Sequence, residues 1–128
     1  MTDFTSALDL STSGLRAQAV RLRHVSENIA NADTPAYRRK AVSFETAFGS
    51  DDGRVSVGRV TLDQKELKEI FNPSHPLADE TGHFKGSNVD LVIEIADARE
   101  AQRSYEANLK MFDQTRQMSS ALMELLRR

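Results

Sequence analysis

Apolar residues recur with a seven-residue repeat at both ends of the chain. One series runs from Leu8 to Ile29 and another from Leu91 to Leu126, each in alternating steps of three and four residues. This spacing places the apolar residues on one narrow stripe, here called the seam, and predicts amphipathic helices over residues 4–30 and 91–127. The seam residues are Leu8, Leu15, Leu22, Val25 and Ile29 in the first helix, and Leu91, Ile95, Ala98, Tyr105, Leu109, Phe112, Met123 and Leu126 in the last.

Two seams of this kind predict that the helices pack on each other. The expected fold class is mainly α, with long N- and C-terminal helices paired as an antiparallel coiled coil and a small irregular β segment between them. Residues 1–36 would be the N-terminal helix and turn of a helical core domain, residues 37–88 an extended linker and small β segment, and residues 89–128 the C-terminal helix of that domain.

The middle of the chain carries shorter signals. Apolar residues alternate around Gly58 between Arg54 and Leu62, which predicts a short hairpin or a bulged strand. Residues 67–71 are expected to form another strand, and residues 50–53 a mobile polar loop tip.

The helix ends have recognisable signals. The side-chain oxygens of Thr2 or Asp3 are suited to cap the first helix, and those of Asn88 or Asp90 the last. Pro35 disfavours helical angles at the residue before it, so the first helix should end near residue 30.

A second apolar stripe runs beside the seam in the last helix. Since one stripe suffices for a two-helix pair, a second stripe indicates contacts on another side of the helix. We expect it to contact neighbouring subunits, which would complete helices that are marginally stable in the isolated chain. The residues of this intersubunit stripe are Met111, Met118, Leu122 and Leu125.

Composition excludes several classes of function. The chain has 17 Lys and Arg against 19 Asp and Glu, so no strong positive field indicates nucleic acid or an anionic membrane. It has no Cys, which excludes thiolate catalysis, Cys-ligated zinc and disulfides. Because no stretch reaches the roughly 20 apolar residues that span a bilayer, we expect no direct membrane insertion. The first residues lack the basic region of a secretory signal, so any export would proceed without a cleaved signal peptide.

Candidate chemistry is weak. The best grouping is His75 and His83 around Asp79 and Glu80, a conceivable metal site that is more simply a polar turn. The adjacent carboxylates are not held across a cleft, and the basic run Arg38-Arg39-Lys40 is more typical of a solvated surface. We therefore predict no catalytic, cofactor-binding or metal-binding residues, and keep a small metal-dependent enzyme as a remote alternative.

Four segments of the chain resemble one family. The segment from Asn28 to Arg38, N-I-A-N-A-D-T-P-A-Y-R, resembles the signature of the axial proteins of the bacterial flagellum, which are the rod, hook and hook-associated subunits. Ala36 stands where that family usually has Gly, and a left-handed residue there would be strained. The segments 72–79, 88–90 and 104–108 resemble the proximal-rod members. The matching residues are Asn28, Ala30, Asn31, Thr34, Pro35, Tyr37, His75, Pro76, Asn88, Val89, Asp90, Tyr105, Ala107 and Asn108.

The resemblance implies a structural subunit of the flagellar proximal rod, in the periplasmic part of the basal body. It implies export by the flagellar type III export apparatus, and terminal helices that pack around the export channel. The expected partners are other rod subunits and copies of the chain itself. Another rod subunit of the same family, or a coiled-coil adapter outside the flagellum, are the structural alternatives.

Overall fold

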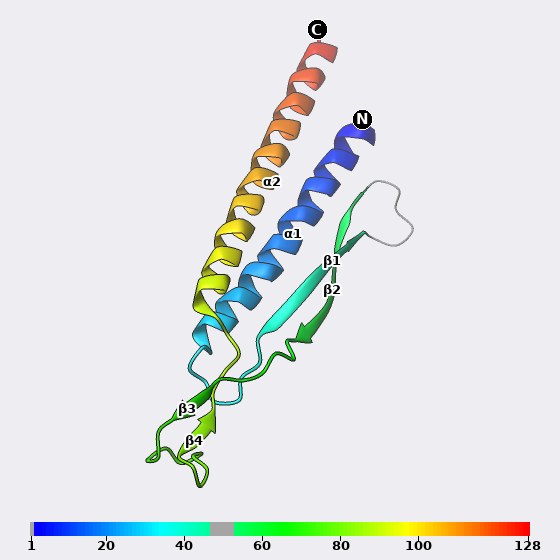
Figure 1. The fold of residues 1–128 in the computed structure, drawn as a ribbon. Helices are drawn as coiled ribbons and strands as arrows, with labels where there is room; N and C mark the ends of the chain where they lie inside the picture. Colours follow the sequence, from blue (N-terminus) through cyan, green and yellow to red (C-terminus); the bar gives the residue numbers. More distant parts are fainter. Residues whose placement is uncertain (1, 47–52) are drawn as a thin grey trace.

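The computed structural model describes residues 2–46 and 53–128 and shows an elongated molecule (Figure 1). The helices α1 and α2 lie side by side and run in opposite directions, so that both termini lie at one end. The predicted mainly helical architecture with a small β segment between two long helices is confirmed, and the β segment is antiparallel. The elements are α1 (Thr2–Ala30), β1 (Lys40–Thr46), β2 (Val55–Leu62), β3 (Glu69–Phe71), β4 (His83–Lys85) and α2 (Leu91–Leu126).

The helix ends follow the predicted signals in part. α1 begins at Thr2, so the expected caps Thr2 and Asp3 lie within the helix rather than ahead of it. Asp90 is the N-cap of α2, where its carboxylate accepts from the Val92 amide at 3.0 Å. The other candidate, Asn88, makes different contacts, described below.

The strands form two separate antiparallel pairs. Residues 55–62 form one strand with an irregular register, which is the predicted bulged strand rather than the hairpin, and its partner β1 was not predicted. The register shifts between Val42 and Phe44, and Gly58 allows the close approach there, since a Cβ at Gly58 would lie 2.5 Å from Ser43 Oγ. The expected strand at 67–71 is β3, paired with the unpredicted β4. The expected loop tip lies outside the described residues except for Gly53.

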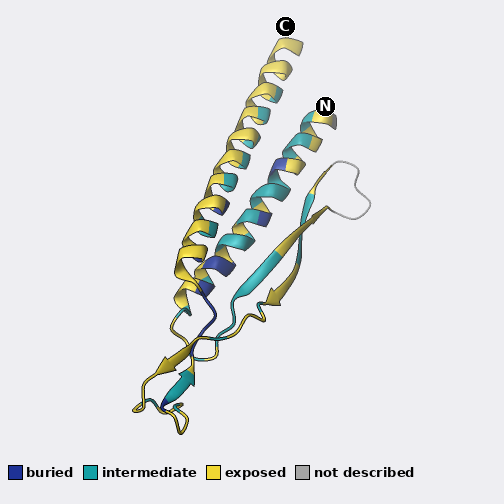
Figure 2. Cartoon of the chain, in the orientation of Figure 1, coloured by how far each residue is buried: buried dark blue, intermediate teal, exposed yellow. Residues whose placement is uncertain are grey.

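The core is thin and unusually polar. It lies between the two helices and the β1–β2 hairpin, while the far part of α2 is exposed (Figure 2). The helices approach closely at Gly14, where an added Cβ would lie 2.7 Å from Asn108 Oδ1. Small and polar side chains therefore line much of the contact. The buried residues are Ala17, Val25, Val89 and Ala101, together with Ser11, His24, Asn28, Ser87, Asn88 and Glu94.

The inner face of α2 is displaced from the expected seam by about one residue. The positions turned inward start at the buried Glu94 and keep heptad spacing through Ala101 and Asn108. The displacement arises because two of these inward positions, Glu94 and Asn108, are polar. The spacing of apolar residues therefore does not mark them. Of the expected seam on α2, the half-buried members are Ala98, Tyr105 and Phe112, and the exposed members are Leu91, Ile95, Leu109, Met123 and Leu126. On α1, Val25 is buried, Leu8, Leu15 and Leu22 are half-buried, and Ile29 is exposed.

Candidate functional site

The end of α1, the turn after it and the segment before α2 meet at the base of the helix pair, a region here called the junction. Its centre is Asn28, which has no exposed surface. The Asn28 amide donates to Lys40 O at 2.9 Å and to Glu94 Oε2 at 3.3 Å. Its oxygen accepts from the Tyr37 hydroxyl at 2.8 Å and the Lys40 amide at 2.9 Å. One side chain thus connects α1, the turn, β1 and α2.

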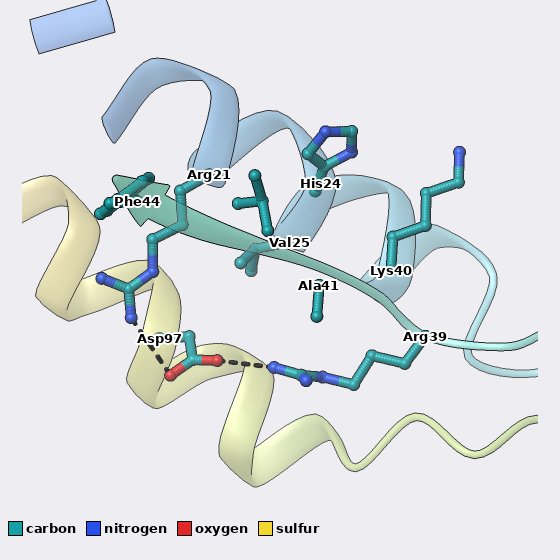
Figure 3. A pocket seen from close by; sticks show the side chains of 9 residues that line it. Arg21, His24, Val25, Arg39, Lys40, Ala41, Phe44 and Asp97 are labelled. Carbon is teal, nitrogen blue, oxygen red and sulfur yellow. Dashed lines mark hydrogen bonds and ion pairs between the residues drawn. The ribbon is translucent and has the colours of Figure 1, made fainter. Parts of the chain in front are cut away.

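A charged network surrounds this amide. Glu94 is fully buried and pairs with the Arg39 guanidinium, which also contacts Asp97 at 2.8 Å. Arg21 of α1 reaches the same Asp97 at 3.4 Å, so two arginines hold one carboxylate from either side (Figure 3). Burial lowers the pKa of Arg39, but the hydrogen bond and charge of Glu94 outweigh it and raise that pKa above its ordinary value. The buried carboxylate is therefore paired with a cation.

Asn88 joins the network to the rest of the β segment. Its oxygen accepts from the Arg39 amide at 2.7 Å, and its amide donates to Asp63 O and Lys65 O at 2.9 and 3.1 Å. The neighbouring Val89 is fully buried, and Lys68 Nζ donates to its carbonyl at 2.7 Å. The Asn88-Val89-Asp90 motif therefore anchors and starts α2.

The turn after α1 is shaped by its own polar residues. The Thr34 hydroxyl donates to Asn31 Oδ1 at 3.0 Å, and Ala36 has a left-handed φ of 60°. The amide of Ala36 donates to Lys85 O at 3.1 Å, which joins the turn to β4. The left-handed conformation that the family's Gly would favour is thus adopted here by an Ala, although the resemblance led us to expect a strained residue at this position. Burial raises the pKa of the Tyr37 hydroxyl above its ordinary value.

A partly open cavity of 320 Å³ lies beside the network, between α1, β1 and α2 (Figure 3). At its rim Lys40 Nζ lies 2.8 Å from Glu27 Oε2, and this hydrogen bond lowers the pKa of Glu27 and raises that of Lys40. His24 Nδ1 lies 3.6 Å from the same carboxylate oxygen. Each cation of the lining already faces a carboxylate. The geometry therefore favours a structural role over anion binding.

The structure brings only part of the motif together. Asn28, Asn31, Thr34, Tyr37 and the 88–90 segment converge at the junction. Ala30 is the last residue of α1, and Pro35 lies in the turn after it. The 104–108 segment lies higher on α2, where Asn108 contacts Gly14, Tyr105 is half-buried and Ala107 is exposed.

His75 and Pro76 lie in the turn between β3 and β4. The His75 ring stacks on Phe84 with centroids 3.9 Å apart, and its Nδ1 accepts from the Leu77 amide. Asp79 Oδ1 accepts from Thr81 and from the His83 amide at 3.0 Å. Among the described residues no group of three or more His, Asp and Glu side chains is placed to hold a metal.

Sequence reasoning missed the residues that carry the network. The sequence alone assigns Arg39 to a solvated basic run and Glu94 to the acidic residues in the first turns of a helix. A signal was present, because Glu94 and Ala101 continue the heptad spacing of Ala98 and Tyr105. The intersubunit stripe, in contrast, lies away from α1. Met111, Met118, Leu122 and Leu125 are 57%, 55%, 40% and 65% exposed.

Comparison with known proteins connects this geometry to a family. The family described as "Flagella basal body rod protein" matches residues 8–38, and that described as "Flagellar basal body rod FlgEFG protein C-terminal" matches residues 80–125. No helix in the described part of the chain is both long and apolar enough to span a bilayer.

Relatives match along nearly the whole chain. "Flagellar basal-body rod protein FlgC" of Agrobacterium fabrum is 42% identical over 99% of this chain and 98% of its own length. The proteins of the same name from Aquifex aeolicus and Salmonella typhimurium are 34% and 37% identical, over 97% and 86% of this chain and 98% and 88% of their own lengths. Identity at this level and coverage, with the rod-family matches at both ends, shows that the chain belongs to the FlgC family of flagellar basal-body rod proteins.

Proposed function

We propose that this structural subunit of the flagellar rod assembles through the outer face of α2. Its partners are other rod subunits and copies of itself, and its place is the proximal rod in the periplasm. The observation that carries the proposal is the number of large apolar side chains near the start and in the second half of α2 that α1 leaves exposed. Family membership supplies the assembly in which such a surface is covered.

Large apolar side chains are exposed near both ends of α2, where Val92 is 76% exposed and Leu126 is 73% exposed, and the middle exposes charged and polar residues between positions 99 and 106. Isolated soluble proteins rarely expose so many large apolar side chains on one helix, whereas assembly surfaces do. The other exposed apolar residues of α2 are Leu91, Ile93, Ile95, Leu109, Met111, Met118, Leu122, Met123 and Leu125.

The inner face of α2 supports pairing with α1 as an antiparallel coiled coil. Its inward positions keep the heptad spacing that allows two helices to follow each other. The junction fixes the relative direction of the helices at one end, since Asn28 and Arg39 hold α1, the turn and α2 together. A helix pair that is joined at one end in this way leaves the outer face of α2 exposed to neighbouring subunits.

Export in an unfolded state, by the flagellar type III export apparatus, fits the same architecture. The chain has no disulfide to break, and its core holds few buried apolar residues. A small core is easily unfolded, because burial of apolar surface is the main source of folding stability. The neighbours in the rod would then restore the stability that the isolated chain lacks.

A double substitution tests the assembly surface. Met118→Ser with Leu122→Ser removes apolar area from the outer face without changing the junction. We expect the variant to be exported at the normal level, to keep the helical circular dichroism of the purified protein, and to be absent from isolated basal bodies. Gln114→Ser with Gln117→Ser, also exposed on α2, is the matched control and should assemble. Normal incorporation of the Met118 and Leu122 variant would refute the proposed surface.

A further inference from the structure

The methionines of this chain are gathered on one part of one helix. The chain has four methionines, and apart from Met1 they are Met111, Met118 and Met123, all in the second half of α2. Their exposed fractions are 57%, 55% and 44%. Met111 and Met118 are seven residues apart, so they lie on the same side of the helix, as members of the intersubunit stripe. In the free chain, solvent therefore reaches the sulfur-bearing side chains of the proposed assembly surface.

The composition of the chain directs a two-electron oxidant to these side chains. The chain has no cysteine and no tryptophan, so the thioethers of methionine are its most readily oxidised groups. Hypochlorous acid adds one oxygen atom to a thioether sulfur, which loses two electrons and becomes a sulfoxide. Chlorine gains the two electrons and leaves as chloride, and one proton is released. A methionine sulfoxide reductase reverses the change, since two thiols form a disulfide and the sulfoxide oxygen leaves as water.

Oxidation would change the stripe without breaking the helix pair. In the turns that carry Met111 and Met118, the half-buried residues are Phe112, Thr115 and Ser119, so the two methionines are not the side chains that α1 covers. A sulfoxide replaces an adaptable apolar group with a polar one. Against an apolar partner surface, the sulfoxide oxygen would lose its water without gaining a hydrogen-bond donor, which is unfavourable.

We propose that Met111 and Met118 are oxidation sites whose state decides whether the free chain can enter the rod. The inference rests on the proposed function, because it adds a regulation to the same stripe. In the free chain an oxidant such as hypochlorous acid converts both residues to sulfoxides, and the oxidised stripe no longer binds its neighbour. A neighbouring subunit that covers the stripe protects both sulfurs. Oxidants therefore act on a subunit before it is incorporated and spare the finished rod.

Oxidation of the purified full-length chain tests whether the sulfurs are accessible. The chain is treated with hypochlorous acid, digested with trypsin and analysed by mass spectrometry. Met111 falls in the tryptic segment 111–116, and tandem spectra separate Met118 from Met123 in the segment 117–127. We expect sulfoxides at Met111 and Met118 and an unchanged helical circular dichroism. The same treatment of isolated basal bodies should leave these two residues largely unoxidised, and equal oxidation of free and assembled chain would overturn the inference.

Paired variants test the consequence for assembly. Met111→Leu with Met118→Leu keeps the stripe apolar but cannot form a sulfoxide, whereas Met111→Gln with Met118→Gln makes it polar without an oxidant. Each full-length variant is expressed as the only copy in the cell, with and without hypochlorous acid, and quantified in isolated basal bodies. The oxidant should lower incorporation of the unchanged chain about five-fold or more relative to the Leu variant. The Gln variant should show a similar loss without oxidant.

A relocated pair of methionines is the matched control. Gln117→Met with Ser120→Met, added to the Leu variant, restores two exposed methionines on another side of α2. This variant should be oxidised to a similar degree as the unchanged chain, yet in the presence of oxidant it should be incorporated like the Leu variant. A loss as large as that of the unchanged chain would overturn the inference, because the position of the sulfoxides would then not matter.

The outcomes distinguish this inference from the proposed assembly surface. If Met118→Ser with Leu122→Ser is absent from basal bodies while the Gln variant is incorporated normally, the surface is supported and the oxidation inference is overturned. An equal loss of the unchanged chain and the Leu variant under oxidant also overturns the inference, because another target is then responsible. Normal incorporation of the Ser variant refutes the proposed surface and, with it, the regulation of that surface.

Discussion

At the scale of single residues, polar side chains make the contacts between elements that apolar side chains make in most protein cores. The Asn28 amide hydrogen-bonds to groups from three other parts of the chain, and the buried Glu94 carboxylate is paired with one guanidinium. Such contacts are directional, so they specify how the helices, the turn and β1 meet. Removal of one partner leaves the other buried without compensation.

The Arg39–Glu94 pair should therefore show strong coupling. Arg39→Met leaves the Glu94 carboxylate buried and unpaired, and we expect a loss of about 3–5 kcal/mol in the free energy of unfolding. The double variant Arg39→Met with Glu94→Leu should lose less than the sum of the single variants, by about 1–3 kcal/mol. Urea unfolding followed by circular dichroism measures the cycle. The exposed Lys85–Glu69 pair is the control, and its coupling energy should lie below about 1 kcal/mol. Additive effects of the Arg39 and Glu94 substitutions would show that the two side chains do not stabilise the chain as a pair.

The strained turn residue offers a change in the opposite direction. Ala36 has a φ of 60°, where a Cβ is unfavourable and glycine is not. Ala36→Gly should raise the free energy of unfolding by about 1 kcal/mol and the melting temperature by about 2–6 °C. Ala19→Gly, at an exposed position inside α1, is the control and should lower stability by about 1 kcal/mol. A lower melting temperature for Ala36→Gly would show that relief of the left-handed angle does not govern the stability of this turn.

At the scale of elements, the two faces of α2 differ in composition and in role. Its inner face is small and polar and packs on α1 and the junction, while its outer face carries the large exposed apolar residues together with charged ones. The helix therefore stabilises the monomer with one face, and we propose that the other takes part in assembly. The apolar pattern in the sequence includes residues of both faces. It therefore placed Leu109 in the seam, although Leu109 is exposed.

Charged substitutions on the two faces should distinguish a role in the stability of the chain from a role in assembly. Ala101 is fully buried, so Ala101→Asp places a carboxylate between the helices and should cost several kcal/mol of stability in the purified chain. Leu109 is 41% exposed, so Leu109→Asp should leave the stability of the purified chain within about 1 kcal/mol while it reduces incorporation into rods. Thermal unfolding and basal-body composition measure the two effects. Equal destabilisation by both changes would mean that Leu109 lies inside the helix pair.

At the scale of the whole molecule, stability is concentrated near the junction and decreases toward the termini. The junction combines the buried network, the turn and the anchored start of α2, whereas the last turns of α2 extend beyond the described part of α1. Regions with few buried contacts open locally long before the molecule unfolds. We therefore expect the end that carries both termini to be the part most dependent on assembly.

Limited proteolysis of the purified chain should follow this gradient. Trypsin should cut first after Arg127 and Arg116, which are exposed on the far part of α2, and only later after Arg21 and Arg39, which are held by carboxylates. Mass spectrometry of the early fragments identifies the cuts, and Asp97→Asn should accelerate the late ones selectively. Early cleavage at Arg39 in the unchanged protein would contradict the gradient.

The sequence by itself determined the broad architecture and the family. Heptad spacing at both ends predicted α1 and α2 within a few residues, because helical periodicity is a local property of the chain. The motif at 28–38 indicated both the end of α1 and the flagellar axial family, and it correctly drew attention to Ala36. Asp90 as the cap of α2 was likewise recognisable, since a cap contacts only its own helix.

Only the tertiary structure decided which face of α2 packs on α1 and where the buried charges lie. Glu94 and Arg39 look like ordinary surface residues in the sequence, because their burial depends on contacts between segments far apart along the chain. The partners β1 and β4 were missed for the same reason, as strand pairing is a nonlocal choice. Periodicity gives the angular position of apolar residues on a helix, but it does not say whether the same molecule or a neighbour covers them.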